Sequence, residues 1–157
     1  CRRTAKKLGG EVYPLYVPAV AAGEFEREIF LKDEMVQQVF DKVAHADYVL
    51  ISAGNLDTST FHNIGAVNKE EAEEMRNKGA VGDIGNWFVD SEGKPVDVAF
   101  HRRLVGPSIF NLKSKAKLVF VAGGELKQKS VWAALKGAVP DVVITDEATA
   151  EYLLNHV

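Results

Sequence analysis

The sequence has one cysteine, no long apolar run and no excess of basic residues. Cys1 has no partner for an internal disulfide, which makes a reducing cytoplasm the expected location. No apolar stretch approaches the roughly 20 residues that a membrane-spanning helix needs. We therefore predict a cytoplasmic protein that does not use a membrane as a partner.

Charge and histidine content exclude two further classes of site. The net charge is −3, and the Lys and Arg residues are dispersed, which argues against a nucleic-acid-binding surface within this chain. The four histidines are scattered, and none has a second ligand at the spacing typical of a metal site. We expect neither a metal nor another cofactor.

The clearest pattern is the stretch 117–154, which reads as strand, glycine turn, helix, strand and helix. Continuous apolar runs at 118–121 and 142–144 are typical of strands covered on both faces. Two such strands joined by a helix lie parallel in one sheet. Ligands of open parallel sheets bind beyond the carboxyl ends of the strands. Here that edge carries Gly123, Gly124 and Lys127.

A second strand, predicted over 47–52, also ends in a glycine, followed by a turn rich in hydroxyl groups at 54–60. Free backbone N–H groups and hydroxyl donors in such a turn suit a phosphate or a carboxylate. Upstream, the apolar spacing over 32–46 predicts an amphipathic helix. The segment 11–17 has strand propensity, with prolines that favour an edge or irregular strand, and 19–26 reads as a loop.

The central part of the sequence predicts a short helix and a hairpin. Asn68 and Glu71 have the spacing of a capping box that opens a helix over 68–78, whose acidic run reads as a solvated face. Valines at 89 and 96 flank a DSEGKP turn, which favours a β-hairpin. Asp83 lies between two glycines in an otherwise apolar stretch, where a carboxylate needs a partner or a ligand.

Three blocks together resemble a known family. They are the glycine and hydroxyl turn at 54–60, GAVGDIGNWFVDSEGKPV at 79–96, and VAGGELKQKSVWAALKG followed by VVITDEATAEYLL. This set resembles the effector-binding, or sugar-binding, domain of SorC/DeoR-type bacterial transcriptional regulators. The resemblance implies an α/β fold: a three-layer, Rossmann-like parallel sheet with helices on both faces and a small β-hairpin insertion, similar to sugar-phosphate isomerases.

The resemblance also implies a function. It predicts a sensor that binds a phosphorylated sugar or polyol, belongs to a homo-oligomer (a dimer or a tetramer), and controls operator DNA through a separate helix-turn-helix domain. Carried over by position, the ligand-binding residues are Gly54, Asn55, Ser59, Thr60, Asp83, Gly123, Gly124 and Lys127. Lys127 falls at the start of its helix, where a cation is unfavourable unless an anion compensates it.

The opening RRTAKKLGG reads as the second half of a helix that ends in a glycine cap. We expect residues 1–157 to form one effector-binding domain that lacks the first strand-helix unit and the DNA-binding domain of the family. The first strand of the family carries a turn that contributes to the ligand pocket.

Other interpretations stay open at this point. The chain could be a sugar-phosphate isomerase or deaminase of the related fold, with Asp83 as a base, although no histidine stands beside the glycine turns in the sequence. Lys127 could form a Schiff base with an open-chain sugar. Lys127 could also be a solvated lysine, Asp83 a structural acid, and Ser59 and Thr60 simple helix caps. Arg102 and Arg103 read as surface or interface residues rather than phosphate ligands.

Overall fold

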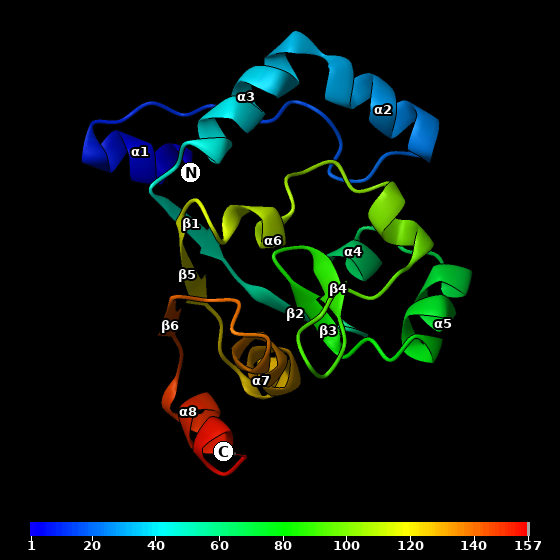
Figure 1. Ribbon diagram of the computed structural model, residues 1–157, viewed down its shortest axis with the longest axis vertical. Coiled ribbons are helices and arrows are strands. Elements are labelled where there is room, and N and C mark those ends of the chain that lie inside the picture. Colours follow the sequence, from blue (N-terminus) through cyan, green and yellow to red (C-terminus); the bar gives the residue numbers. More distant parts are fainter. Residues whose placement is uncertain (157) are drawn as a thin grey trace.

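The computed structural model describes residues 1–156 and contains two small sheets. Strands β1 (Tyr48–Ile51), β5 (Lys117–Val121) and β6 (Val142–Ile144) form a parallel sheet in the order β1-β5-β6 (Figure 1). The parallel sheet and its strand-helix-strand connection were predicted from the sequence, and both are confirmed. Strand β1 is an edge of this sheet among the described residues.

The second sheet is antiparallel and carries the hairpin. Strand β2 (Ala53–Asn55) follows β1 after one residue and pairs with β3 (Gly82–Ile84), which pairs with β4 (Trp87–Val89). The β3–β4 turn is formed by Gly85 and Asn86, both with positive φ, as in the tight turns that match strand twist. The hairpin predicted around residues 89–96 has a shorter paired region than expected. Among residues 1–156 it is held by an isolated bridge between Val89 and Pro95.

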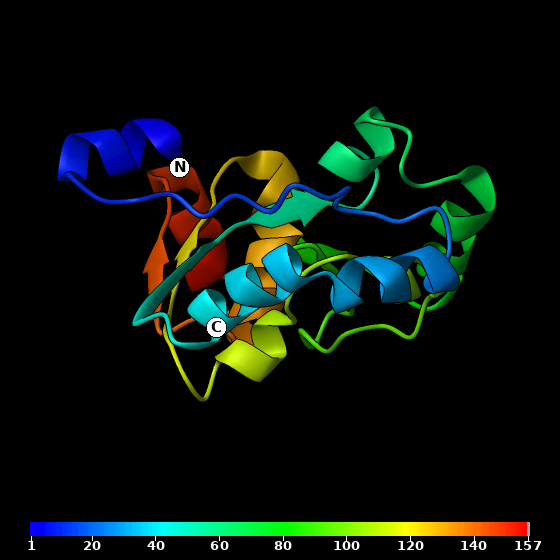
Figure 2. The same ribbon diagram turned by 90° about the horizontal axis from the view of Figure 1, so that it is seen from above.

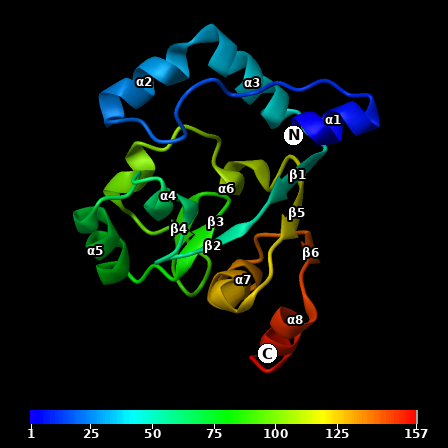
Figure 3. The same ribbon diagram turned by 180° about the vertical axis from the view of Figure 1, so that it is seen from behind.

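One core lies between the parallel sheet and its helices. Helix α7 (Gln128–Lys136) connects β5 to β6, α8 (Glu147–Leu154) follows β6, and α6 (Ile109–Leu112) precedes β5 (Figure 3). These helices share an apolar core with the strand side chains that point towards them, among them Leu118 and Phe120. The opposite face is open: Leu50 is 73 % exposed, and Tyr48, Val121, Val142 and Ile144 are also exposed. The expectation that the strands at 118–121 and 142–144 are covered on both faces was therefore wrong on this outer face.

The N-terminal third wraps around one end of the molecule (Figure 2). It contains α1 (Arg2–Leu8), α2 (Glu24–Lys32) and α3 (Glu34–Ala44), and α3 confirms the predicted amphipathic helix. Two expectations failed here. The segment 11–17 forms no strand, because Pro14 lacks an N–H group and no strand among residues 1–156 pairs with the segment. Most of the predicted loop 19–26 is loop, but α2 begins within it at Glu24.

A second core lies under α4 (Thr60–Asn63) and α5 (Lys69–Asn77), beside the 3-10 helix η1 (Ala99–Arg102). The capping box of α5 is confirmed: Asn68 and Glu71 exchange side-chain and backbone hydrogen bonds. Glu71 is not part of a solvated face, since it is buried and paired with Arg103 at 2.7 Å. A second 3-10 helix, η2 (Glu125–Lys127), opens α7. No described helix is long and apolar enough to cross a membrane.

Candidate functional site

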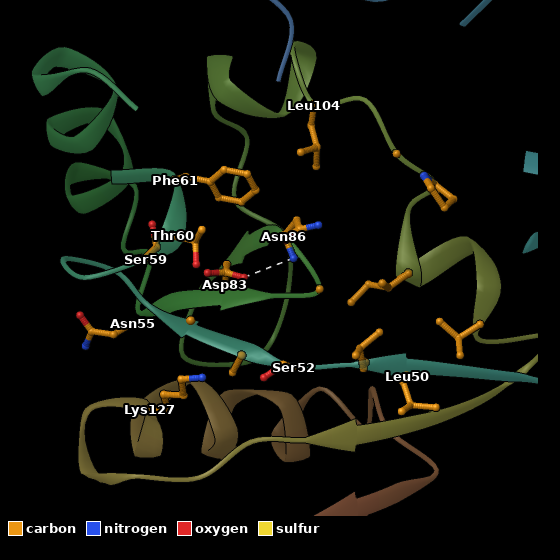
Figure 4. A pocket seen from close by; sticks show the side chains of 18 of the residues that line it. Leu50, Ser52, Asn55, Ser59, Thr60, Phe61, Asp83, Asn86, Leu104 and Lys127 are labelled. Carbon is orange, nitrogen blue, oxygen red and sulfur yellow. Dashed lines mark hydrogen bonds between the residues drawn. The ribbon is translucent and has the colours of Figure 1, made fainter. Parts of the chain in front are cut away.

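A cavity of about 540 Å³ opens where the two sheets meet. Its walls come from β1 and β2, the turn and first residues of α4, the β3–β4 turn, the loop 104–107, and η2 (Figure 4). Small-molecule sites of proteins typically enclose between about 300 and 1,000 Å³. The cavity therefore has room for a metabolite of the size of a sugar phosphate.

The structure brings six of the eight predicted ligand-binding residues to this cavity. They come from four separate parts of the chain, namely β2, the start of α4, β3 and η2. The six residues are Gly54, Asn55, Ser59, Thr60, Asp83 and Lys127. Figure 4 shows the labelled side chains of this set at one end of the cavity, away from Leu50. The juxtaposition agrees with the predicted site, while its role in binding stays a prediction.

Asp83 is a buried carboxyl group at the centre of the polar end. It lies opposite Gly54 in the β2–β3 pairing, and its Oδ2 accepts a hydrogen bond from the Asn86 N–H at 3.2 Å. Burial raises the pKa of Asp83 to about 6, partly offset by the Asn86 N–H and by the charge of Lys127. The group is therefore able to change protonation state near neutral pH and to accept hydrogen bonds from a ligand.

Lys127 supplies the positive charge of this end. It is the last residue of η2 and the N-cap of α7, as the sequence predicted to within one residue. The Asn55 amide donates to the Leu126 carbonyl at 2.9 Å, which holds η2 against β2. None of the ion pairs found among residues 1–156 includes Lys127. Its ammonium group is thus available to an anion in the cavity.

Ser59 and Thr60 start α4, and a histidine accompanies them. Ser59 is the N-cap and lies 3.0 Å through its Oγ from the Nδ1 of His62. The sequence analysis did not single out His62, which the structure places against Ser59 and not among the residues that line the cavity. The spacing of Ser59 and His62, three residues apart across a helix start, was the signal that could have identified the pair.

Ser130 is a second residue that the sequence did not single out. It is fully buried in α7, and its Oγ donates to the Gly54 carbonyl at 2.8 Å. A Cβ at Gly82 would lie 2.0 Å from this oxygen, so only glycine fits there. Ser130 therefore fixes the helix that begins at Lys127 against the strands that carry Gly54 and Asp83.

Gly123 and Gly124 lie outside the cavity. The Gly124 N–H donates to the carboxyl of Asp146 and, at 3.2 Å, to Thr149 Oγ1. A Cβ at Gly123 would lie 2.2 Å from Asp146 Oδ2. Asp146 also caps α8, and its hydrogen bonds to Thr149 and Gly124 lower its pKa. In this structure the two glycines join the turn after β5 to the start of α8.

The other end of the cavity is apolar. It is bordered by side chains of α3, β1, the loop 104–107 and α6: Val43, Val49, Leu50, Ile51, Leu104, Val105, Pro107, Ile109 and Leu112. We call this apolar end the apolar trough. It follows the outer edge of β1, which pairs with no other strand among residues 1–156. The site is therefore amphipathic along its length, with its charged and hydroxyl groups at the β2 end.

Comparisons with known proteins identify the family of this chain. Residues 1–155 match a family model described as "Putative sugar-binding domain". The transcriptional regulator YjhU of Escherichia coli is 34% identical over 96% of this chain and 46% of its own length. The erythritol catabolism regulatory protein EryD of Brucella abortus is 31% identical over 97% of this chain and 48% of its own length. The chain thus spans about half the length of these curated relatives.

A solved structure shows the same fold. The sugar-binding domain of a transcriptional repressor from Vibrio fischeri superposes with a TM-score of 0.90 at 31% identity, covering 99% of this chain and 63% of the other. Sequence and fold thus agree over nearly the whole chain. The chain belongs to the family of sugar-binding domains found in SorC/DeoR-type transcriptional regulators.

Proposed function

We propose that this chain is the effector-sensing domain of a sugar-responsive transcriptional regulator, and that it binds a phosphorylated sugar or polyol without transforming it. The observation that carries the proposal is the polar end of the cavity, where one amine in no ion pair among residues 1–156 and one buried carboxyl group face the same space. An anion stabilises Lys127, and sugar hydroxyls offer donors to Asp83.

The chemistry of the walls supports this choice of ligand. A phosphate group needs a positive charge and several hydrogen-bond donors. On the cavity wall, Lys127 supplies the charge, and the hydroxyls of Ser59 and Thr60 and the side-chain amide of Asn86 supply donors. A neutral sugar would leave the ammonium group of Lys127 uncompensated at a helix start. The polar end therefore suits a ligand that combines an anionic group with hydroxyl groups.

In the proposal, ligand binding changes the affinity of a separate domain for operator DNA. The regulator acts in the cytoplasm as a homo-oligomer, either a dimer or a tetramer. Residues 1–157 would then be one effector-binding domain completed by an upstream strand-helix unit. The unpaired edge of β1 supports this arrangement, because it borders the apolar trough and faces no other strand among residues 1–156. A parallel strand added there would cover the trough and contribute a wall to the site.

The proposal is tested with the full-length regulator and a panel of sugar phosphates, each paired with its unphosphorylated sugar. We expect one phosphorylated compound to raise the melting temperature with no product formed, since a ligand at about 100 times its Kd adds roughly 2.7 kcal/mol. The same compound should change operator affinity in a gel-shift titration. Conversion of the compound into a product would overturn the sensor proposal in favour of an isomerase or a deaminase.

Two lysines on the same helix provide a matched pair of variants. Lys127→Ala should abolish the ligand-induced rise in melting temperature and leave the ligand-free melting temperature nearly unchanged. Lys129→Ala, an exposed residue two positions further on, should leave both unchanged. A large loss of stability in ligand-free Lys127→Ala would make Lys127 a structural residue. Borohydride reduction followed by mass spectrometry should show no sugar adduct on Lys127.

A further inference from the structure

Ser59, which lines the cavity, forms a hydrogen-bonded pair with His62, which does not. Ser59 is only 2 % exposed, yet it borders the cavity. Its Oγ lies 3.0 Å from His62 Nδ1 and accepts a hydrogen bond from the His62 backbone N–H at 3.4 Å. The other ring nitrogen, Nε2, is buried and has no hydrogen-bond partner among residues 1–156.

This pattern distinguishes the two neutral tautomers of the His62 ring. If Ser59 donates to Nδ1, the ring proton sits on Nε2 as a buried N–H without an acceptor. If the proton sits on Nδ1, it is donated to Ser59 Oγ, and Nε2 is left as an acceptor without a donor. For backbone groups, a buried N–H without an acceptor is rarer than a buried acceptor without a donor, and we apply the same rule to the ring nitrogens. The geometry therefore favours the tautomer with its proton on Nδ1.

The tautomer decides what Ser59 offers to a ligand. With the proton on Nδ1, Ser59 Oγ accepts two hydrogen bonds, one from the ring and one from the His62 backbone. Both lone pairs are then used, and the hydroxyl proton has no acceptor among residues 1–156. We propose that His62 is a positioning residue that fixes Ser59 as a hydrogen-bond donor to the cavity.

A hydroxyl fixed as a donor bonds most strongly to an anionic oxygen that only accepts. Phosphate and carboxylate oxygens are of this kind, whereas a sugar hydroxyl also brings a proton. Ser59 and Lys127 lie at the same end of the cavity (Figure 4), so the anionic group of the ligand binds at this end. This inference rests on the proposed function and adds to it the location of the anionic group and the residue that orients its donor.

The first test needs no ligand. Two-bond ¹H–¹⁵N correlation spectra of the ¹⁵N-labelled chain distinguish the tautomers of His62 at a pH of about 8.5, above the range in which imidazoles ordinarily titrate. His62→Phe assigns the signal. We expect a protonated Nδ1 and an unprotonated Nε2. A proton on Nε2 would overturn the inference whether or not the chain binds sugar phosphates.

The second test uses inorganic phosphate as the probe, titrated into the wild type, Ser59→Ala, His62→Phe and the double variant. We expect each single change to weaken phosphate binding by about tenfold, which corresponds to one charge-assisted hydrogen bond. The double variant should bind as weakly as either single variant, because His62 acts only through Ser59. Multiplied effects in the double variant would contradict the positioning role.

The two tests separate the inference from the proposed function. If neither inorganic phosphate nor any sugar phosphate of the panel binds the wild type while the ring proton is on Nδ1, the tautomer stands, and the role of Ser59 as an anion donor falls with the sensor. If a sugar phosphate binds but Ser59→Ala leaves phosphate binding unchanged, the sensor stands and this inference falls. Circular dichroism of every variant shows whether a loss of binding reflects a loss of fold.

Discussion

Gly54 and Asp83 lie opposite each other on β2 and β3, so close that a Cβ at Gly54 would be 2.0 Å from Asp83 Oδ1. The missing side chain at Gly54 is what allows the Asp83 carboxyl group to lie against β2 at the cavity wall. Gly54 and Asp83 thus form one structural unit, although they are 29 positions apart in the sequence.

Substitution of Gly54 by alanine should displace the Asp83 carboxyl group. We expect Gly54→Ala to abolish binding of the sugar phosphate and to lower the free energy of unfolding by about 1–3 kcal/mol, the usual cost of an overpacked site. Urea denaturation and ligand titration measure the two effects. Backbone strain does not contribute, because the φ of Gly54 is not in the left-handed region.

Two further variants test whether the clash is the cause. Gly10→Ala is the control, since a Cβ there meets no atom within 4 Å and the φ is again not left-handed. Adding Asp83→Ala to Gly54→Ala should recover most of the lost stability, but not the binding. If the stability is not recovered, Gly54 acts through something other than Asp83.

The stability of the domain should carry a pH dependence from Asp83. Its folded-state pKa of about 6 lies above the ordinary value of 3.8, so the folded protein binds this proton more tightly than the unfolded chain. The resulting stabilisation, about 3 kcal/mol, is complete below pH 3.8 and is lost as the pH rises through 6.

Asp83→Asn isolates this effect. The free energy of unfolding of the wild type minus that of Asp83→Asn should fall by about 2.4 kcal/mol between pH 4 and pH 7. Denaturant titrations at several pH values measure this difference. A constant difference across that range would show that the carboxyl group is not desolvated as the structure indicates.

His101 should produce the opposite dependence over an overlapping range. Burial lowers the pKa of His101 from 6.5 to about 4, and its Nε2 accepts a hydrogen bond from the Phe88 N–H at 2.9 Å. A folded-state pKa below that of the unfolded chain means that stability is complete above pH 6.5 and is lost as the pH falls through 4.

Gln at position 101 keeps a hydrogen-bond acceptor but cannot titrate. We expect the wild type to lose about 3 kcal/mol relative to His101→Gln between pH 7 and pH 4. Because Asp83 gains stability over the same interval, the wild type alone should show a shallow profile. Steep and opposite profiles of Asp83→Asn and His101→Gln would reveal the two contributions, and parallel profiles would refute the assignment.

Arg103 should be a stability residue and not a ligand. Its guanidinium group binds Glu71 at 2.7 Å and donates to the carbonyls of Ala21 and Ala66, which joins three segments beside the cavity loop 104–107. Arg103→Ala leaves the buried carboxylate of Glu71 unpaired and should cost about 3–5 kcal/mol of unfolding free energy.

Its neighbour is the matched control for this experiment. Arg102 is exposed, and its ion pairs with Glu24 and Asp97 are both 3.7 Å long. Arg102→Ala should change the unfolding free energy by no more than about 0.5 kcal/mol in thermal or urea denaturation. Equal losses in the two variants would mean that the buried pair contributes no more than a surface pair.

Local signals were enough to predict much of the fold. The capping box at Asn68 and Glu71 and the strand over the apolar run 118–121 each depend on residues within a few positions of one another, and both are confirmed. The segment 11–17 failed because strand propensity describes a single segment, whereas a strand also needs a neighbour to pair with. The solvated interpretation of Glu71 failed because its partner, Arg103, is 32 positions away.

The sequence by itself determined which chemical groups this protein has near its strand ends: a glycine, two hydroxyls, an acid and a lysine in motifs typical of one family. The tertiary structure alone decided which of them meet. It brought Asp83 against Gly54, placed Lys127 on the same cavity, set Gly123 and Gly124 against the start of α8 with the Gly124 N–H bonded to it, and added His62 behind Ser59. The physical reason is that periodicity and capping act over a few residues, whereas a cavity depends on how distant segments pack together.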